Sequence, residues 1–167
     1  LLQKLFTLPT TKRMVFKGGT SLSKVYNIIQ RFSEDVDITI DYRDFKALDL
    51  EMISRSQLKK ISAELKAILA NVISESIVPH LQNQIAKLPH SEQYTLDFDT
   101  EVIRFYYPSV VTQLDIMESA ISDTYLRDHV LIELGMRNST EPCEQHRIKP
   151  ILSTIETEEP LAYPEAT

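Results

Sequence analysis

Cysteine, histidine and long apolar runs are scarce in this chain of 167 residues, and each scarcity excludes a class of protein. The one cysteine, Cys143, excludes an internal disulfide and a zinc site built from cysteines, as is usual in a reducing cytoplasm. The four histidines lack the spacing of metal ligands. No apolar run approaches the length of a membrane-spanning helix, and the N-terminus lacks a signal-peptide pattern. We therefore expect a soluble cytoplasmic protein with no membrane partner.

Positive charge is also in deficit. Lysine and arginine number 18 against 24 aspartates and glutamates, a formal net charge of -6. This balance argues against a wholly basic nucleic-acid binder, although a local basic patch remains compatible with docking an RNA end. The hydrophobic fraction of 43% is enough for one domain with a core of its own.

A turn that suits an anion follows the short apolar run Met14–Phe16. Its residues are Lys17, Gly18, Gly19, Thr20 and Ser21. The glycines can adopt positive φ and let a ligand approach the backbone, and either hydroxyl can cap the helix predicted next. Free N–H groups at a helix N-terminus form a natural anion site. The plainer interpretations are an ordinary strand-to-helix turn, hydroxyls that only cap, and a solvated Lys17.

Acidic residues alternate with apolar ones over residues 35–41. With a strand period of two, Asp35 and Asp37 share one face while the intervening valine and isoleucines face the core. Two carboxylates within about 7 Å repel each other unless a cation lies between them, and Mg²⁺ bound to nucleotide phosphates is the natural candidate. Asp41 lies on the same face near the strand end, where we expect solvent exposure.

Together these features resemble a known signature. Gly-Gly-Thr-Ser, a helix and then Asp-x-Asp on the next strand are similar to the polymerase-beta-type nucleotidyltransferase superfamily. Residues 16–40 resemble the AbiEii/AbiGii toxin family more closely, and residues 130–150 match it more weakly. The resemblance implies an α+β fold of polymerase-beta type, a mixed β-sheet with flanking helices. It also implies the toxin of a bacterial toxin–antitoxin pair that acts in abortive infection, a form of phage defence.

The resemblance implies further site residues. Arg31 and Ser33 occupy the family's Arg-Phe-Ser run, where Arg31 would hold the aspartates or contact a phosphate, unless it is a surface arginine. Nucleotidyl transfer by this architecture usually needs a third carboxylate on a neighbouring strand. Glu133 is the preferred candidate because its surroundings match the family better, and Asp115 has the same acid-between-apolar pattern. The plainer interpretation of both is an exposed acid on a half-buried strand.

The implied reaction joins a nucleoside monophosphate from an NTP to an acceptor, such as the end of a tRNA, and releases pyrophosphate. Asp35 and Asp37 would hold two Mg²⁺ or Mn²⁺ ions, Glu133 would bind the catalytic one, and the turn from Gly18 to Ser21 would bind the β- and γ-phosphates. A cognate antitoxin would restrain the activity. The alternatives are a degenerate transferase that binds a nucleotide or protein without turnover, and a glycosyltransferase, which would share Asp-x-Asp but lack the glycine turn.

The chain shows no internal repeat and is predicted to form one transferase domain over residues 1–155. Periodicity predicts helices over residues 1–6, 22–30, 44–51, 57–77 and 81–88, with Pro79 ending or bending the longest. Strands are predicted over residues 14–17, 35–42, 94–98, 102–107, 110–117 and 129–136. Residues 156–167 are predicted to be an acidic tail or linker. Relatives continue into a helical part, so we expect the domain to be truncated.

Overall fold

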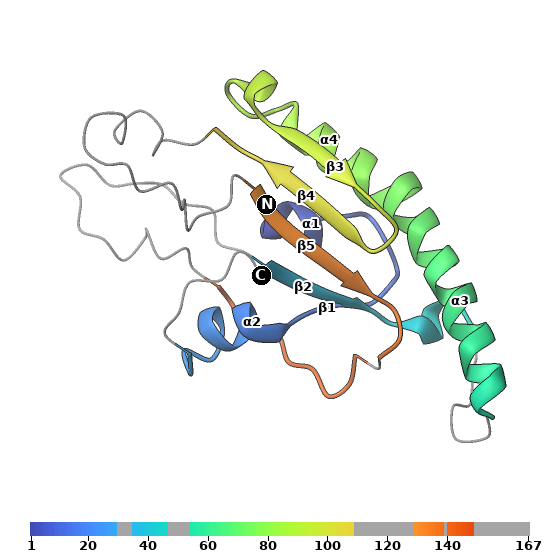
Figure 1. Cartoon of the computed structure of the whole chain (residues 1–167). Coiled ribbons are helices and arrows are strands. Elements are labelled where there is room, and N and C mark those ends of the chain that lie inside the picture. Colours follow the sequence, from blue (N-terminus) through green and yellow to red (C-terminus); the bar gives the residue numbers. More distant parts are fainter. Residues whose placement is uncertain (30–34, 47–53, 109–128, 139, 149–167) are drawn as a thin grey trace, which may run out of the picture.

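The computed structural model describes residues 1–29, 35–46, 54–108, 129–138 and 140–148, and a five-stranded sheet forms its centre (Figure 1). The strands are β1 (Met14–Lys17), β2 (Asp35–Ile40), β3 (Thr95–Phe98), β4 (Val102–Tyr106) and β5 (His129–Gly135). They lie in the order β1-β2-β5-β4-β3. The pair β2–β5 is parallel and the other three pairs are antiparallel. The mixed α+β architecture predicted from the sequence is confirmed.

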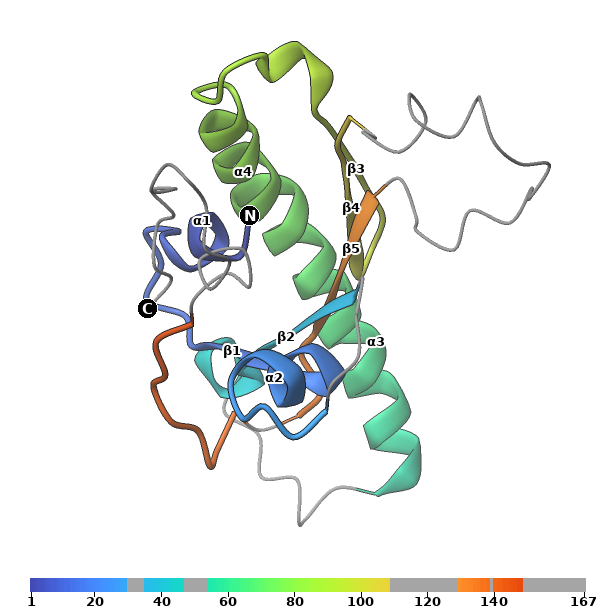
Figure 2. The same cartoon turned by 90° about the vertical axis from the view of Figure 1, so that its left-hand side faces the viewer.

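Helices cover one face of this sheet. They are α1 (Leu2–Phe6), α3 (Arg55–Val72) and α4 (Val78–Ile85), whereas α2 (Gly18–Lys24) follows β1 directly. Figure 2 shows α1 and α4 on the same side of strands β3, β4 and β5. Helix α3 begins with a capping box, in which Ser54 and Gln57 bond to each other's backbone N–H groups.

The core lies between the sheet and these helices. Alternation in the two central strands turns their apolar residues toward it, and Ile38 and Ile132 are almost fully buried. The helices contribute Leu69, Ile73 and Leu81, each at most 1% exposed. Because the apolar positions occupy one face, the polar positions of β2 and β5 must share the other.

The long helix does not end where proline predicts. A π-helical turn (Ile73–Ile77) joins α3 to α4, and Pro79 lies in the first turn of α4. Of the two effects predicted for Pro79, ending or bending the helix, ending is contradicted, because the predicted helices 57–77 and 81–88 form one continuous helical segment (Figure 1). Proline removes an N–H and crowds the carbonyl four residues earlier, and the wider turn accommodates both effects. Ile73 and Ile77 are fully buried there.

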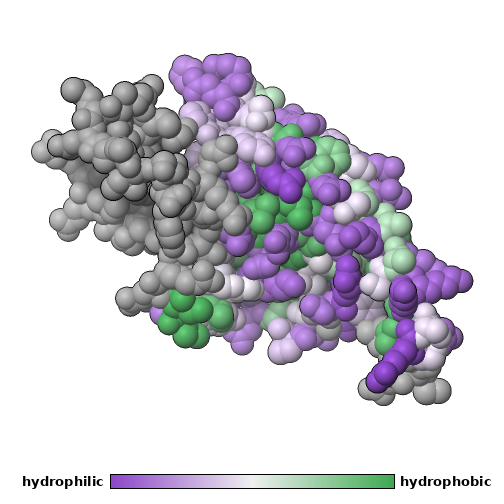
Figure 3. All heavy atoms as spheres, in the orientation of Figure 1, coloured by the Kyte–Doolittle hydropathy of each residue, from purple (hydrophilic) through white to green (hydrophobic). Residues whose placement is uncertain are grey.

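Helix α2 begins and ends earlier than predicted. It starts at Gly18 instead of residue 22 and stops at Lys24, and Asn27 adopts a left-handed conformation with φ 52°. The apolar period over residues 22–30 therefore does not mark a core-facing helix. Leu22, Tyr26 and Ile28 are exposed, and Figure 3 shows apolar surface over this part of the molecule.

The remaining predicted elements agree with the structure where it describes them. The first helix and the first strand are confirmed, and the other four described strands differ from their predictions by one or two residues at an end. The predicted helix 44–51 is replaced at its start by a 3₁₀ turn (Tyr42–Asp44). Residues 47–53, the predicted strand 110–117 and the predicted boundary between residues 155 and 156 lie outside the described residues.

Candidate functional site

The register of the sheet places three predicted site residues in one row. Lys17 on β1 pairs with Asp37 on β2, and Asp37 pairs with Glu133 on β5. Partners in neighbouring strands share a face and lie about 5 Å apart. Residues separated by 20 and 96 positions in the sequence thus become direct neighbours on the face opposite the core, with Val102 of β4 completing the row.

This row lies in an open cleft of about 520 Å³. The cleft is lined by Lys17, Asp37, Glu101, Val102, Glu133, Leu134, Gly135, Arg137 and Asn138. Among the described residues, the carboxylates of Asp37 and Glu133 make neither a hydrogen bond nor an ion pair. Two adjacent carboxylates without such partners repel each other, which destabilises the protein without ligand and favours the binding of a cation between them. The Lys17 amine reaches toward β5, 3.9 Å from where a Cβ on Gly135 would lie.

The glycine turn and the acidic strand are in direct contact. Gly18 has a φ of +76°, which L side chains rarely adopt. A Cβ at this position would lie 1.8 Å from Oδ2 of Asp37. Gly18 therefore both makes the turn into α2 and leaves room for the Asp37 carboxylate.

Asp35 occupies the same strand face as Asp37 but does not line the cleft. Its neighbour on β5 is Leu131, and one of its carboxylate oxygens is buried. No group of three or more carboxylate, histidine or cysteine side chains within the described ranges could hold a metal ion. Asp37 and Glu133 still fit Mg²⁺, because this ion is commonly bound by one or two carboxylates together with waters and substrate phosphates.

The hydroxyls of the turn bond within the protein. Thr20 Oγ1 donates a hydrogen bond to the carbonyl of Asp35, and Ser21 Oγ donates to the carbonyl of Gly18 at 2.8 Å. Neither caps α2, whose N-cap residue is Lys17 without a side-chain bond, so the capping prediction is wrong. Their contact with phosphate stays a prediction, as does that of Gly19.

Three other candidates cannot be placed. Arg31, Ser33 and Asp115 lie outside the described residues. Of the two candidates for the third carboxylate, Glu133 is therefore the one whose position is known, beside Asp37.

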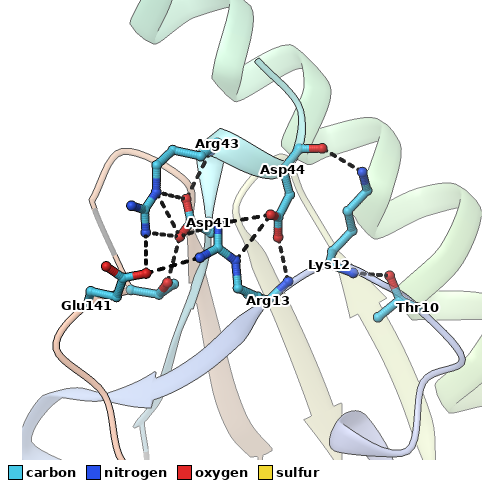
Figure 4. A network of polar contacts seen from close by, with 8 residues as sticks. Thr10, Lys12, Arg13, Asp41, Arg43, Asp44 and Glu141 are labelled. Carbon is cyan, nitrogen blue, oxygen red and sulfur yellow. Dashed lines mark hydrogen bonds and ion pairs between the residues drawn. The ribbon is translucent and has the colours of Figure 1, made fainter. Parts of the chain in front are cut away.

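The prediction that Asp41 is exposed is wrong. Its side chain is fully buried and accepts hydrogen bonds from Arg43 (2.7 Å) and Thr140 (2.6 Å), while Arg13 lies 3.2 Å away (Figure 4). The hydrogen bond from Arg43 holds the pKa of the Asp41 carboxyl well below its ordinary value, against the effect of burial. Glu141 contacts both arginines, so the network ties the end of β2 to the segment after β5.

Sequence reasoning missed Glu101, Arg137 and Asn138 in the cleft. Arg137 could have been found, since it continues the alternation of Glu133 and Gly135 beyond the end of β5. Glu101 lies in the turn between β3 and β4, where no local pattern distinguishes it from any solvated acid.

The fold and cleft define a class of protein: an α+β domain with an acidic pair on neighbouring central strands and a lysine beside it. A family model for the nucleotidyl transferase AbiEii toxin of type IV toxin–antitoxin systems matches residues 1–167. The chain belongs to this family, as the sequence resemblance predicted. Searches of curated proteins and of solved structures gave no match. In the part of the chain that the structure describes, no helix is long and apolar enough to cross a membrane.

Proposed function

We propose that this chain is a metal-dependent nucleotidyltransferase of polymerase-beta type, with its site in the cleft of Asp37 and Glu133. The observation that carries the proposal is the row Lys17–Asp37–Glu133. In this row, two carboxylates without a partner among the described residues lie beside a lysine. All three residues lie in the part of the chain that matches the family. Asp37 and Glu133 would hold Mg²⁺ or Mn²⁺, which would neutralise phosphate charge and align the attacking oxygen. Lys17 would bind a phosphate, together with Gly18, Gly19, Thr20 and Ser21 of the turn.

The reaction is an in-line displacement at phosphorus. A hydroxyl of the acceptor attacks the α-phosphorus of the NTP, the bond from this phosphorus to the bridging oxygen breaks, and pyrophosphate leaves. The proton of the hydroxyl passes to a carboxylate. Glu133 is our candidate for this base because it is exposed in the cleft, whereas Asp37 lies against Gly18. An RNA such as tRNA is the proposed acceptor, and a cognate antitoxin in the cytoplasm is the proposed partner.

One observation favours a second function. Because Asp35 does not line the cleft and no three-ligand cluster exists in the described ranges, the site also suits a protein that binds a nucleotide without turnover. Both functions require the cleft to bind NTP and metal. They differ in whether a phosphorus–oxygen bond breaks.

Transfer of label from an NTP labelled at the α-phosphate tests the proposal. The protein is incubated with bulk tRNA, Mg²⁺ and each common NTP in turn, and labelled RNA is measured. We expect labelling that Asp37→Asn and Glu133→Gln each reduce at least about 100-fold. Asp97→Asn serves as the control, since this exposed acid on β3 lies outside the cleft. NTP binding without label transfer would favour the second function, and transfer that survives Asp37→Asn would contradict the proposed site.

A further inference from the structure

Arg137 and Glu101 meet in the wall of the cleft. Arg137 follows the end of β5, and Glu101 comes from the turn between β3 and β4. Arg137 Nη2 donates a hydrogen bond to Oε1 of Glu101 at 2.9 Å. Both residues line the cleft that contains Asp37 and Glu133. The segment after β5 thus brings an additional cation to the proposed site, and the turn between β3 and β4 brings its carboxylate partner.

Glu101 is held in place from several sides. Lys66 of α3 lies 2.9 Å from its second carboxylate oxygen, and its backbone carbonyl accepts a 2.8 Å hydrogen bond from the amide of Leu134. The hydrogen bond from Lys66 and the charge of Arg137 keep the pKa of Glu101 below its ordinary value. Since a cation already contacts each oxygen, Glu101 is suited to supporting Arg137 rather than to binding a metal.

Arg137 keeps most of its hydrogen-bonding capacity. A guanidinium carries five N–H donors, and within the described ranges the bond to Glu101 is the only one that Arg137 makes. Its backbone follows Met136, which is 1% exposed and anchored in the core. Its side chain is 55% exposed, and ion pairs exposed to this degree add little to stability. The ion pair with Glu101 therefore contributes too little to stability to explain why the Arg137 guanidinium is held at this position.

The charges of the cleft indicate what such a cation would bind. The Lys17 amine lies near Gly135, two residues before Arg137, so two cations stand at the same end of β5. Asp37 and Glu133 are suited to a divalent ion. A ligand that satisfies all four side chains carries several negative charges and brings a divalent cation, as a polyphosphate does.

We propose that Arg137 is a polyphosphate-binding residue of the cleft and that Glu101, fixed by Lys66, positions its guanidinium. This inference rests on the proposed function and deepens it, because the ligand is the phosphate chain that leaves as pyrophosphate. Arginine suits this role, since its planar fork donates two parallel hydrogen bonds to a phosphate. Glu101 acts only through Arg137.

Binding of inorganic tripolyphosphate with Mg²⁺, measured by isothermal titration calorimetry on the full chain, tests the inference. We expect Arg137→Gln to weaken binding about tenfold or more and Arg137→Lys to recover part of it. Arg104→Gln is the matched control, because Arg104 also pairs with a carboxylate, Asp97 at 3.5 Å, but does not line the cleft. Urea denaturation shows whether each variant folds. If Arg137→Gln does not fold, Arg137→Lys provides the test.

A double-mutant cycle tests the role of Glu101. Glu101→Gln should weaken tripolyphosphate binding about threefold in the native background and have no effect when Arg137 is already glutamine. A purely structural role would give the same loss in both backgrounds.

Three results overturn the inference: native protein that does not bind tripolyphosphate, binding that Arg137→Gln leaves unchanged, and an equal loss in Arg104→Gln. The label-transfer assay decides the proposed function separately. Binding that depends on Arg137 without any transfer would uphold the polyphosphate site and reject the transferase. Label transfer that does not depend on Arg137 would uphold the transferase and reject the polyphosphate site at Arg137.

Discussion

The carboxylate of Asp37 lies where a side chain on Gly18 would have to be. A Cβ built on Gly18 comes within 1.8 Å of Oδ2 and 2.6 Å of Cγ of Asp37. The glycine turn after β1 and the acidic position of β2 are therefore one structural unit.

Gly18→Ala should damage both the fold and the site. Alanine disfavours a φ of +76° by roughly 1–2 kcal/mol, and its methyl group would displace the Asp37 carboxylate. We expect a free energy of unfolding lower by about 2 kcal/mol in urea denaturation, together with loss of Mg²⁺-dependent NTP binding. Gly19→Ala is the stability control, because Gly19 lies within α2 and has no positive φ. Equal stability of the Gly18→Ala and native proteins would contradict the contact with Asp37.

Thr20→Val should loosen the junction between α2 and β2. Thr20 is 7% exposed and its hydroxyl donates to the carbonyl of Asp35, so valine would leave that carbonyl without this donor. We expect a loss of about 1–2 kcal/mol in the free energy of unfolding. Thr20→Ser keeps the hydroxyl and should lose less. If Thr20→Ser and Thr20→Val lower the free energy of unfolding equally, the hydrogen bond to Asp35 does not contribute to stability.

Patterns local in sequence predicted the central part of the fold well. Alternation in β2 identified Asp37 as a site-facing residue and Ile38 as core, because a strand with one buried face allows no other register. The pairing of Asp37 with Glu133 could be predicted only through the family resemblance, since nothing local links residues 96 positions apart. The pairing of Lys17 with Asp37 followed neither from the local pattern nor from the family resemblance, because it depends on the antiparallel register of β1 and β2.

Errors arose where tertiary contacts override local pattern. Asp41 continues the polar face of β2, which predicts exposure, yet Arg43, Arg13 and Thr140 surround it. Pro79 is a helix-breaking residue, yet the π-helical turn before it carries the helix onward. Both outcomes depend on partners that periodicity does not reveal.

Asp41→Asn should be costly at neutral pH. The buried carboxylate has charge-assisted hydrogen bonds to Arg43 and an ion pair with Arg13, so its neutralisation should lower the free energy of unfolding by about 2 kcal/mol. Glu141→Gln removes an exposed partner of the same arginines and should lower it by less than about 1 kcal/mol. Urea denaturation of both variants measures the difference.

The cost of Asp41→Asn should shrink in acid. The pKa of Asp41 is lower in the folded state than its ordinary 3.8, so the unfolded chain binds protons more readily and stability rises with pH. The contribution of Asp41 is therefore complete above about pH 5 and is lost as pH falls below about 4 toward the lowered pKa. The difference between native protein and variant should shrink in this range. A difference that stays constant down to pH 2.5 would show that the charge of Asp41 is not its source.

Thermal stabilisation by NTP and Mg²⁺, compared between native protein and Asp37→Asn, tests the central claim most directly. Without ligand, the variant should melt at the same or a slightly higher temperature, because it removes repulsion between the adjacent carboxylates of Asp37 and Glu133. With NTP and Mg²⁺ together, the native protein should gain several degrees, and the variant should gain none. Equal stabilisation of both proteins, or stabilisation that needs no metal, would contradict a metal–nucleotide site at Asp37 and Glu133.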